Sequence, residues 1–269
     1  MCLYDGCCNM PERSSHSGWS APELGGAELA RRWELASGHY PEQEAGKPRL
    51  LRLLGELDFL IEPLRRLWRR IDIAPTTRPQ TVLIVPGFGA GPDRMRYMAR
   101  LLEQAGHRTK RWGLGFNWGA DRAAFEQLED RLGKVCQRYD DKVVLLGWSL
   151  GGLYARELAR RHPGCVRKVI TLGSPFSGSK RANNVWRLYQ AITGHSVDQP
   201  PIDADVAQKP PVETVAMWSP SDGAIAPRSA AGRPSERDRA QALRCSHMGF
   251  TYSPQAIKAV LDELERSPQ

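Results

Sequence analysis

The sequence has no hydrophobic run that approaches the length of a membrane-spanning helix without charges. Its first residues, MCLYDGCCNMPERSS, show neither a basic start nor a continuous apolar stretch, so we expect no signal peptide. The six cysteines are too scattered for a disulfide framework, and no cysteine or histidine pair completes a zinc pattern (Cys2, Cys7, Cys8, Cys136, Cys165, Cys245). These features predict a cytoplasmic protein with reduced thiols and no metal site.

A basic stripe interleaved with aromatic residues is also missing, although the 269-residue chain carries a formal net charge of +8. Residues 1–75 contain ten Lys/Arg against eleven Asp/Glu, so all of the excess lies beyond them. There the arginines are spread over predicted helix faces and over one loop at residues 228–239. We therefore expect no nucleic-acid partner.

The stretch that organises the chain is KVVLLGWSLGGLYA, residues 142–155. Its apolar start is typical of a parallel strand buried on both faces, and a helical pattern follows the motif Gly-Trp-Ser-Leu-Gly at once. A strand, a tight turn with serine at its apex and a helix form a nucleophile elbow. The residues two before and two after Ser149 must be nearly free of side chain, and Gly147 and Gly151 meet that need. The pentapeptide alone is common, so the flanking strand and helix carry the inference.

Strands and helices alternate after an extended linker at residues 74–79. We expect strands at residues 81–85, 108–112, 143–146, 165–172, 212–218 and 240–245, and helices at 93–104, 120–139, from the motif to 161, at 184–193 and at 254–266. Residues 228–239 read as a polar loop. This order predicts an α/β fold whose mostly parallel sheet is covered by helices on both faces. We expect one catalytic domain at residues 76–269 with a short cap insertion at 174–211.

A helical N-terminal extension is expected over residues 1–75, with residues 1–20 flexible. Residues 21–37 read as a short helix ended by Gly38, and residues 49–70 as a stronger helix that Pro63 should kink or divide. The second helix has two interpretations. Its apolar and basic residues fit a peripheral membrane or partner contact, while the favoured interpretation is a helix packed on the catalytic domain with its arginines solvated.

A serine nucleophile needs a base and a group that orients the base. In an open parallel sheet the site lies at the carboxyl ends of the strands. His247 follows the last predicted strand, whereas His107 follows a helix and His162 sits at a helix end, so His247 is the expected base. Asp222 follows the strand at 212–218 and is the expected acid, although Asp-Gly is also a common turn pair.

The negative charge of a tetrahedral intermediate calls for two pre-aimed donors, typically backbone N–H groups. The N–H of Leu150, directly after the serine, is one candidate. The second should come from the glycine-rich loop after the first strand, where Phe88 stands between Gly87 and Gly89. That loop lacks the sequence of a phosphate-binding or dinucleotide-binding motif.

From about residue 81 to 266 the chain resembles the α/β-hydrolase superfamily and is most similar to its lipase-like and esterase-like members. The resemblance rests on the segments IVPGFGAG (84–91), GFNWG (115–119), LLGWSLGG (145–152), ITLGSPFSG (170–178), SPSDGAIAP (219–227) and CSHMGF (245–250). It implies Ser149 as nucleophile, Asp222 as acid, His247 as base, and Phe88 and Leu150 as oxyanion donors. Pro86 stands where many relatives have histidine, and the first antiparallel strands usual in the fold are not evident.

The predicted cap helix presents an apolar face beside two arginines. Together with nearby aromatic residues it suggests a hydrophobic acyl pocket, whose candidate walls are Trp148, Phe176, Trp186, Tyr189 and Trp118. We expect hydrolysis of a small-molecule or lipid carboxylic ester through an acyl-serine intermediate, without metal or organic cofactor. An acyltransferase, a thioesterase or amidase, and a non-catalytic binding protein of the same fold remain alternatives.

Membrane contact could occur through residues 49–70 or the cap helix, and the sequence does not fix the oligomeric state.

Overall fold

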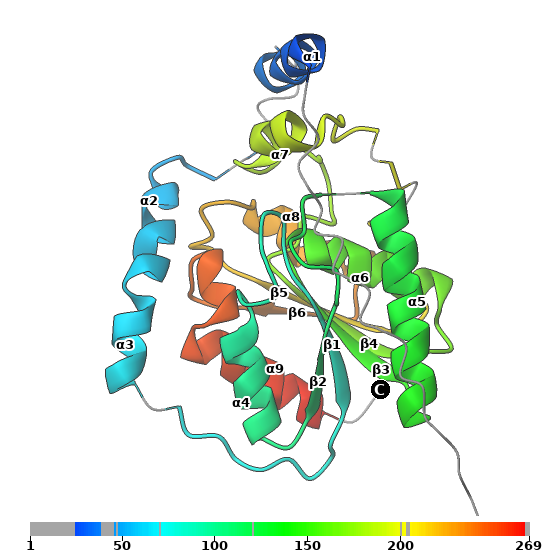
Figure 1. The fold of residues 1–269 in the computed structure, drawn as a ribbon. Coiled ribbons are helices and arrows are strands. Elements are labelled where there is room, and N and C mark those ends of the chain that lie inside the picture. Colours follow the sequence, from blue (N-terminus) through cyan, green and yellow to red (C-terminus); the bar gives the residue numbers. More distant parts are fainter. Residues whose placement is uncertain are drawn as a thin grey trace, which may run out of the picture.

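A six-stranded parallel sheet forms the centre of the computed structural model, which describes residues 25–38, 46, 48–69, 71–119, 121–199, 201–202 and 205–266. The strand order is β2-β1-β3-β4-β5-β6, and every neighbouring pair runs parallel (Figure 1). The strands are β1 (Thr81–Val85), β2 (Arg108–Arg111), β3 (Val143–Trp148), β4 (Val166–Leu172), β5 (Glu213–Trp218) and β6 (Arg239–Ala242). The predicted parallel sheet is confirmed, and the described residues add no antiparallel strand to it.

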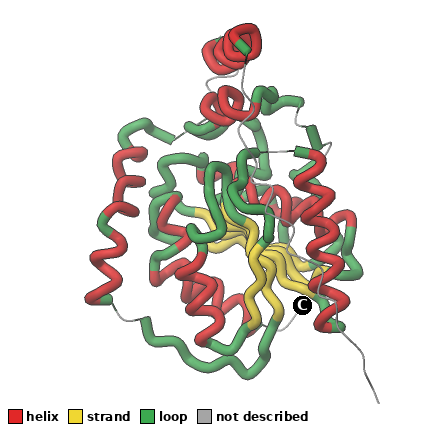
Figure 2. Tube along the Cα trace, viewed as in Figure 1, coloured by secondary structure: helices red, strands yellow, loops and turns green. Residues whose placement is uncertain are grey.

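Helices cover both faces of this sheet (Figure 2). Alternate strand residues divide between two cores: Val82 and Ile84 of β1 join one, and Leu83 and Val85 join the other. The first core is closed by α4 (Arg96–Gln104) and α9 (Pro254–Glu265), the second by α5 (Arg122–Tyr139) and α6 (Leu150–Arg161). Burial on both faces explains the uninterrupted apolar runs of the central strands.

The predicted element boundaries need small corrections. The helix expected from residue 93 begins at Arg96, because residues 92–95 form turns, and the last strand covers residues 239–242 instead of 240–245. The predicted polar loop at 228–239 contains α8 (Pro227–Ala231) and the single turn η3 (Pro234–Glu236). Each of these helices has a proline in its first turn, where the missing N–H costs nothing.

The expected cap contains α7 (Trp186–Thr193), and α1 (Gly26–Ser37) lies on top of it (Figure 1). Arg31 donates a hydrogen bond of 3.0 Å to the carbonyl of Gly194, and Gln190 donates to the carbonyl of Leu35 at 2.5 Å. The N-terminal extension is thus joined to the cap across more than 150 residues of chain. Residues 1–20, which the sequence predicts to be flexible, lie outside the described residues, and the division at residue 75 stays a prediction.

The second part of the extension is divided as predicted, into α2 (Arg52–Glu56), η2 (Leu57–Leu60) and α3 (Glu62–Trp68), with Pro63 in the first turn of α3. The segment contacts the catalytic domain as predicted, but its apolar side chains face outward. Those exposed are Leu50, Leu51, Leu54, Leu57, Leu60, Ile61, Leu64 and Trp68. The acidic side faces the domain instead: Glu62 is buried, and Glu56 hydrogen bonds to loops of the sheet. No helix in the described part of the chain is long and apolar enough to cross a membrane.

Candidate active site

Ser149 lies at the apex of the turn between β3 and α6, with φ 53° and ψ −122°. Residues other than glycine rarely adopt these backbone angles, which lift the serine hydroxyl out of the sheet. The two flanking glycines make the turn possible. A Cβ on Gly147 would lie 2.4 Å from the carbonyl oxygen of Gly151, and a Cβ on Gly151 would lie 2.3 Å from that of Val85.

Asp222 and His247 meet at the carboxyl ends of β5 and β6, and both side chains are buried. The Nδ1 atom of His247 lies 2.8 Å from Oδ2 of Asp222. The other carboxylate oxygen of Asp222 accepts hydrogen bonds from the backbone N–H groups of Ala224 at 2.8 Å and Ile225 at 2.7 Å. With both oxygens engaged, the carboxylate has one fixed orientation toward the imidazole.

The environment of His247 raises its pKa above the ordinary value of 6.5. Burial disfavours the charged imidazolium, but the charge of Asp222, its hydrogen bond and the charge of Glu56 outweigh that effect. The imidazole is therefore a stronger base than an exposed histidine. A base of this kind is suited to accept a proton near neutral pH.

Ser149 follows β3 and therefore lies at the same edge of the sheet as this pair, where the strands end. The ring of His247 is 5.4 Å from the ring of Trp148, the residue directly before the serine. Within the described residues the hydroxyl of Ser149 and the imidazole do not form a hydrogen bond. Such contacts often tighten only when substrate binds. The three expected residues are thus brought to one edge of the sheet, with the Asp222–His247 contact formed.

The two expected oxyanion donors both lie beside the serine. Leu150 opens α6, where the first N–H has no acceptor within the helix. Phe88 follows β1 in a loop that Asn117 contacts twice. The side-chain amide of Asn117 donates to the carbonyl of Pro86 at 2.8 Å, and its backbone carbonyl accepts from the N–H of Gly89 at 2.7 Å. Asn117 is buried and fixes the loop at two points.

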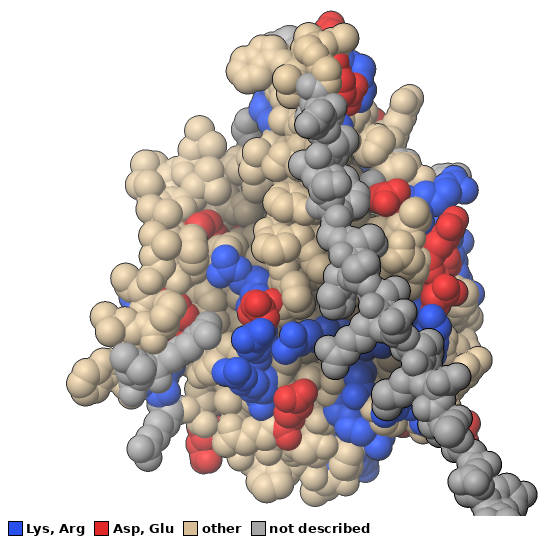
Figure 3. All heavy atoms as spheres, viewed as in Figure 1, with Lys and Arg blue, Asp and Glu red and all other residues tan. Residues whose placement is uncertain are grey.

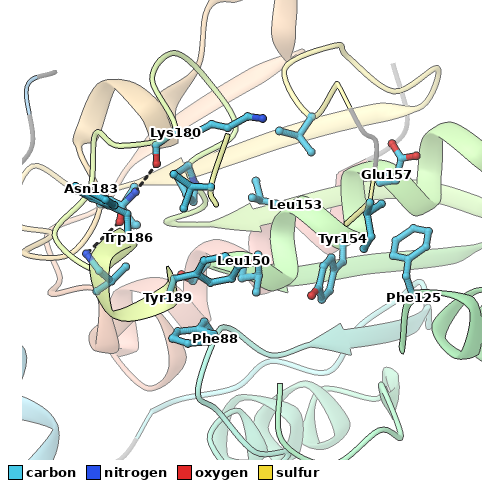
Figure 4. Close-up of a pocket in the computed structure, with 17 residues that line it drawn as sticks. Phe88, Phe125, Leu150, Leu153, Tyr154, Glu157, Lys180, Asn183, Trp186 and Tyr189 are labelled. Carbon is cyan, nitrogen blue, oxygen red and sulfur yellow. Dashed lines mark hydrogen bonds between the residues drawn. The ribbon is translucent and has the colours of Figure 1, made fainter. Parts of the chain in front are cut away.

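A cavity of about 150 Å³ opens beside Ser149. Figure 4 shows the side chains that line it. Its walls come from the Phe88 loop, α5, α6 and the cap, and are mainly apolar; they include Phe88, Phe125, Leu150, Leu153, Tyr154, Val185, Trp186, Tyr189, Ile202 and Ile225. The buried guanidinium of Arg156 secures the cap segment by donating to the carbonyl of Val206 at 2.7 Å. An apolar chain attached to a reacting carbonyl fits this shape and chemistry.

Of the residues expected to form the pocket, Trp186 and Tyr189 line this cavity and the others do not. Trp148 is buried in the core of α4 and α9, and its indole N–H donates to the carbonyl of His247. Phe176 is buried beneath the guanidinium of Arg156, at 4.0 Å from the ring centre. Trp118 is exposed and stacks on Phe116. These three aromatic residues are part of the packing or the surface, not of the cavity wall.

Sequence reasoning missed three residues of the site. Glu56 contacts the loops of Asp222 and His247, Asn117 fixes the Phe88 loop, and the buried hydroxyl of Tyr154 lies in the cavity wall. Only Asn117 carried a signal, since it stands in the quoted GFNWG segment. Among the residues that the structure describes, no cluster of His, Cys, Asp or Glu side chains could hold a metal ion.

Parts of the chain are similar to known proteins. Residues 80–191 match the family model described as alpha/beta hydrolase fold. The chain is 36% identical over 97 residues to the pimeloyl-[acyl-carrier protein] methyl ester esterase of Aromatoleum aromaticum, a match that covers 36% of this chain and 38% of the relative. It is 32% identical over 130 residues to the protein of the same name from Nitrosospira multiformis, covering 40% of this chain and 48% of the relative. The chain thus spans less than half the length of either relative.

Solved structures share the architecture. The mature form of a Bacillus licheniformis lipase superimposes with a TM-score of 0.52 at 15% identity, over 72% of this chain and 96% of the lipase. An α/β-hydrolase enzyme from the metagenome of lagoon sediments superimposes with a TM-score of 0.50 at 17% identity, over 70% of this chain and 91% of that one. At this identity the likeness is one of fold. With the parallel sheet and the serine elbow, it establishes that this chain has the α/β-hydrolase fold of the lipases and esterases.

Proposed function

We propose that the protein hydrolyses carboxylic esters with a hydrophobic acyl group through an acyl-serine intermediate. One observation carries the proposal: a serine held in an elbow conformation borders an apolar cavity, beside a buried imidazole that a carboxylate orients. Two of these features alone would fit a structural role. Their coincidence at one edge of the sheet favours catalysis.

In this mechanism the hydroxyl of Ser149 attacks the ester carbonyl while Nε2 of His247 takes its proton. Asp222 accepts the Nδ1–H of the imidazole, which fixes the tautomer and stabilises the imidazolium. The oxyanion receives hydrogen bonds from the N–H groups of Phe88 and Leu150, each worth on the order of 3 kcal/mol. The imidazolium then protonates the leaving alcohol. Water next attacks the acyl-serine while Nε2 of His247 takes its proton, and the imidazolium protonates the Ser149 oxygen as the acid is released.

The cavity supports an apolar acyl chain as the bound part of the substrate. Its lining is aromatic and aliphatic around the serine, and its volume of about 150 Å³ suits a medium-length chain better than an acetyl group. The relatives named above are esterases of a methyl ester carried on acyl-carrier protein. Methyl esters of such chains therefore belong in the substrate panel.

The test combines a reactivity probe with a substrate series. A fluorophosphonate labels only an activated serine, so we expect labelling of the native protein and its loss in Ser149→Ala. The cap variant Ser196→Ala is the matched control and should label normally. With aryl esters of increasing acyl length, kcat/KM should rise from acetyl to a medium chain; negligible rates at every length would contradict the proposal.

Transfer of the acyl group to an acceptor other than water, or action on a thioester or amide, uses the same residues. Product analysis with an added alcohol or amine separates these possibilities. Hydrolysis predicts the free acid as the main product, whereas acyl transfer predicts a new ester or amide. A non-catalytic binding protein predicts no labelling of Ser149 at all.

A further inference from the structure

The carboxylate of Glu56, at the end of α2, contacts the loops of both Asp222 and His247. Its Oε1 accepts hydrogen bonds from the backbone N–H groups of Gly223 at 2.9 Å and His247 at 2.8 Å. Its Oε2 accepts from the N–H of Met248 at 2.8 Å. One side chain of the N-terminal extension thus links the residue after the acid to the base itself.

The rest of α2 is seated on the Asp222 loop. Arg52 donates a hydrogen bond of 2.6 Å to the carbonyl of Pro220. Gly223 packs so closely that an added Cβ would lie 2.5 Å from the carbonyl oxygen of Arg52. Asn184, which precedes α7, donates to the carbonyls of Gly223 at 2.8 Å and Pro48 at 3.0 Å. The extension, the acid loop and the cap therefore meet at one point.

We propose that Glu56 is a positioning residue of the catalytic triad: it holds the loops of Asp222 and His247 at fixed separation and adds a second negative charge near the imidazole. The inference rests on the proposed function. It also gives the N-terminal extension a role in the reaction, since without α2 the three backbone N–H groups lose their acceptor.

Glu56 and Asp222 are the two carboxylates that raise the pKa of His247 against the effect of burial. The neighbouring Cys245 and Tyr252 are uncharged at neutral pH, because burial raises the pKa of each to about 12. Removing the charge of Glu56 should therefore lower the pKa of His247. Loss of the hydrogen bonds should separately loosen the geometry of the triad.

The experiment compares Glu56→Gln and Glu56→Ala with Asp58→Asn as the matched control. Asp58 lies two residues away on the same extension, and pairs with Arg65 instead of the triad loops. The pKa of His247 is measured by NMR of the imidazole, which needs no substrate, and kcat and KM are measured as a function of pH. Thermal unfolding reports whether each variant is folded.

For Glu56→Gln we expect a lower His247 pKa and an acid limb of kcat/KM moved to lower pH. For Glu56→Ala we expect kcat to fall about 10- to 100-fold, as misplacement of a catalytic group does, with KM changed less than about threefold. Asp58→Asn should leave all of these unchanged. A His247 pKa and kcat that stay at the native values in both Glu56 variants would overturn the proposal.

Two further outcomes keep this test separate from the proposed function. If no ester is hydrolysed by the native protein but Glu56→Gln lowers the pKa of His247, the effect of the Glu56 charge on the imidazole is supported and the esterase proposal is contradicted. If Glu56→Ala does not fold, Glu56→Asp is the variant that tests the proposal. It keeps the negative charge, but its side chain is one methylene shorter, so the carboxylate oxygens lie further from the backbone N–H groups of the two loops. A lower kcat in the folded Glu56→Asp protein supports the proposal, and an unchanged kcat contradicts it.

Discussion

The indole N–H of Trp148, the residue directly before the nucleophile, donates a hydrogen bond of 3.1 Å to the backbone carbonyl of His247. The bond crosses from β3 to the loop after β6 and links the elbow to the base, 99 residues further along the chain. Glu56 holds the same backbone from its N–H side. His247 is therefore fixed through its main chain at both polar groups.

Trp148→Phe tests this link, because phenylalanine keeps most of the buried apolar area and lacks the donor. We expect kcat to fall several-fold and the free energy of unfolding to fall by about 1–2 kcal/mol, since a buried carbonyl loses its partner. Steady-state kinetics and urea denaturation measure the two effects. A variant with native kcat would show that the link has no part in placing the base.

The pH dependence follows from the raised pKa of His247. The general base must be neutral, so kcat/KM should fall as the pH drops through a midpoint above 6.5. The stability of the fold should depend on pH in the opposite sense. The charged imidazole of His247 stabilises the folded protein fully at a pH below the pKa of this residue in the unfolded chain, and this stabilisation is lost as the pH rises through its pKa in the folded protein. The stability difference between native protein and His247→Gln should thus be larger at about pH 6 than at about pH 9. An acid limb centred below 6.5 would contradict the assignment.

The parts of the fold that sequence predicts are those in which local composition determines the outcome. The apolar runs of β1, β3 and β4 identify buried strands, and glycines at 147 and 151 identify the elbow, because no larger residue fits there. The positions of Asp222 and His247 follow from a topological rule, that sites lie at the carboxyl ends of parallel strands. The hydrogen bond between Asp222 and His247 agrees with that rule.

Long-range contacts explain what sequence could not predict. Glu56 meets Met248 across 192 residues, and nothing near Glu56 in the sequence distinguishes it from a solvated helix residue. The same contact explains why α2 and α3 meet the domain through acidic side chains: with Glu56 held inward, the leucines face outward. Likewise, the aromatic residues of the cap region could not be divided between cavity and core without the packing of Arg156 on Phe176.

Asn117 offers a test of the oxyanion loop. Asn117→Ala removes the side-chain bond to the carbonyl of Pro86 and leaves a buried acceptor without a partner. We expect kcat to fall about tenfold or more, because the N–H of Phe88 is no longer aimed, while fluorophosphonate labelling slows in proportion. Phe116→Leu, at the exposed neighbouring position, is the control and should keep native rates. Equal rates for native protein and Asn117→Ala would remove Asn117 from the site.

Tyr154 offers a test of stability inside the cavity. Its hydroxyl is buried and has no hydrogen-bond partner within the part of the chain that the structure describes, and burial raises its pKa well above 10.0. Tyr154→Phe removes this unpaired group at nearly constant shape. We expect the free energy of unfolding to rise by about 1 kcal/mol, measured by urea denaturation, and rates on apolar acyl esters to stay equal or rise. Destabilisation by a similar amount would mean that the hydroxyl has a partner.

The outward face of α2, η2 and α3 is rich in exposed apolar side chains. Residues 49–70 hold six arginines against three acids, and two of those acids, Glu56 and Glu62, face the domain. In Figure 3 the left edge, where these helices lie, is mostly tan. An apolar face on a segment whose sequence has a net positive charge matches an anionic lipid surface, so we expect binding to phosphatidylglycerol vesicles and weaker binding to neutral ones.

Vesicle co-sedimentation tests which surface makes this contact. Replacing Leu54, Leu57 and Leu64 by serine should weaken binding at least about tenfold, because each exposed leucine contributes on the order of 1 kcal/mol or more on burial. Leu188→Ser, on the exposed face of the cap helix, is the matched control and should bind as the native protein does. Loss of binding with Leu188→Ser alone would assign the contact to the cap instead. A native dimer that dissociates in the triple variant would show that a second copy of the chain covers this face, since a lipid contact leaves the oligomeric state in solution unchanged.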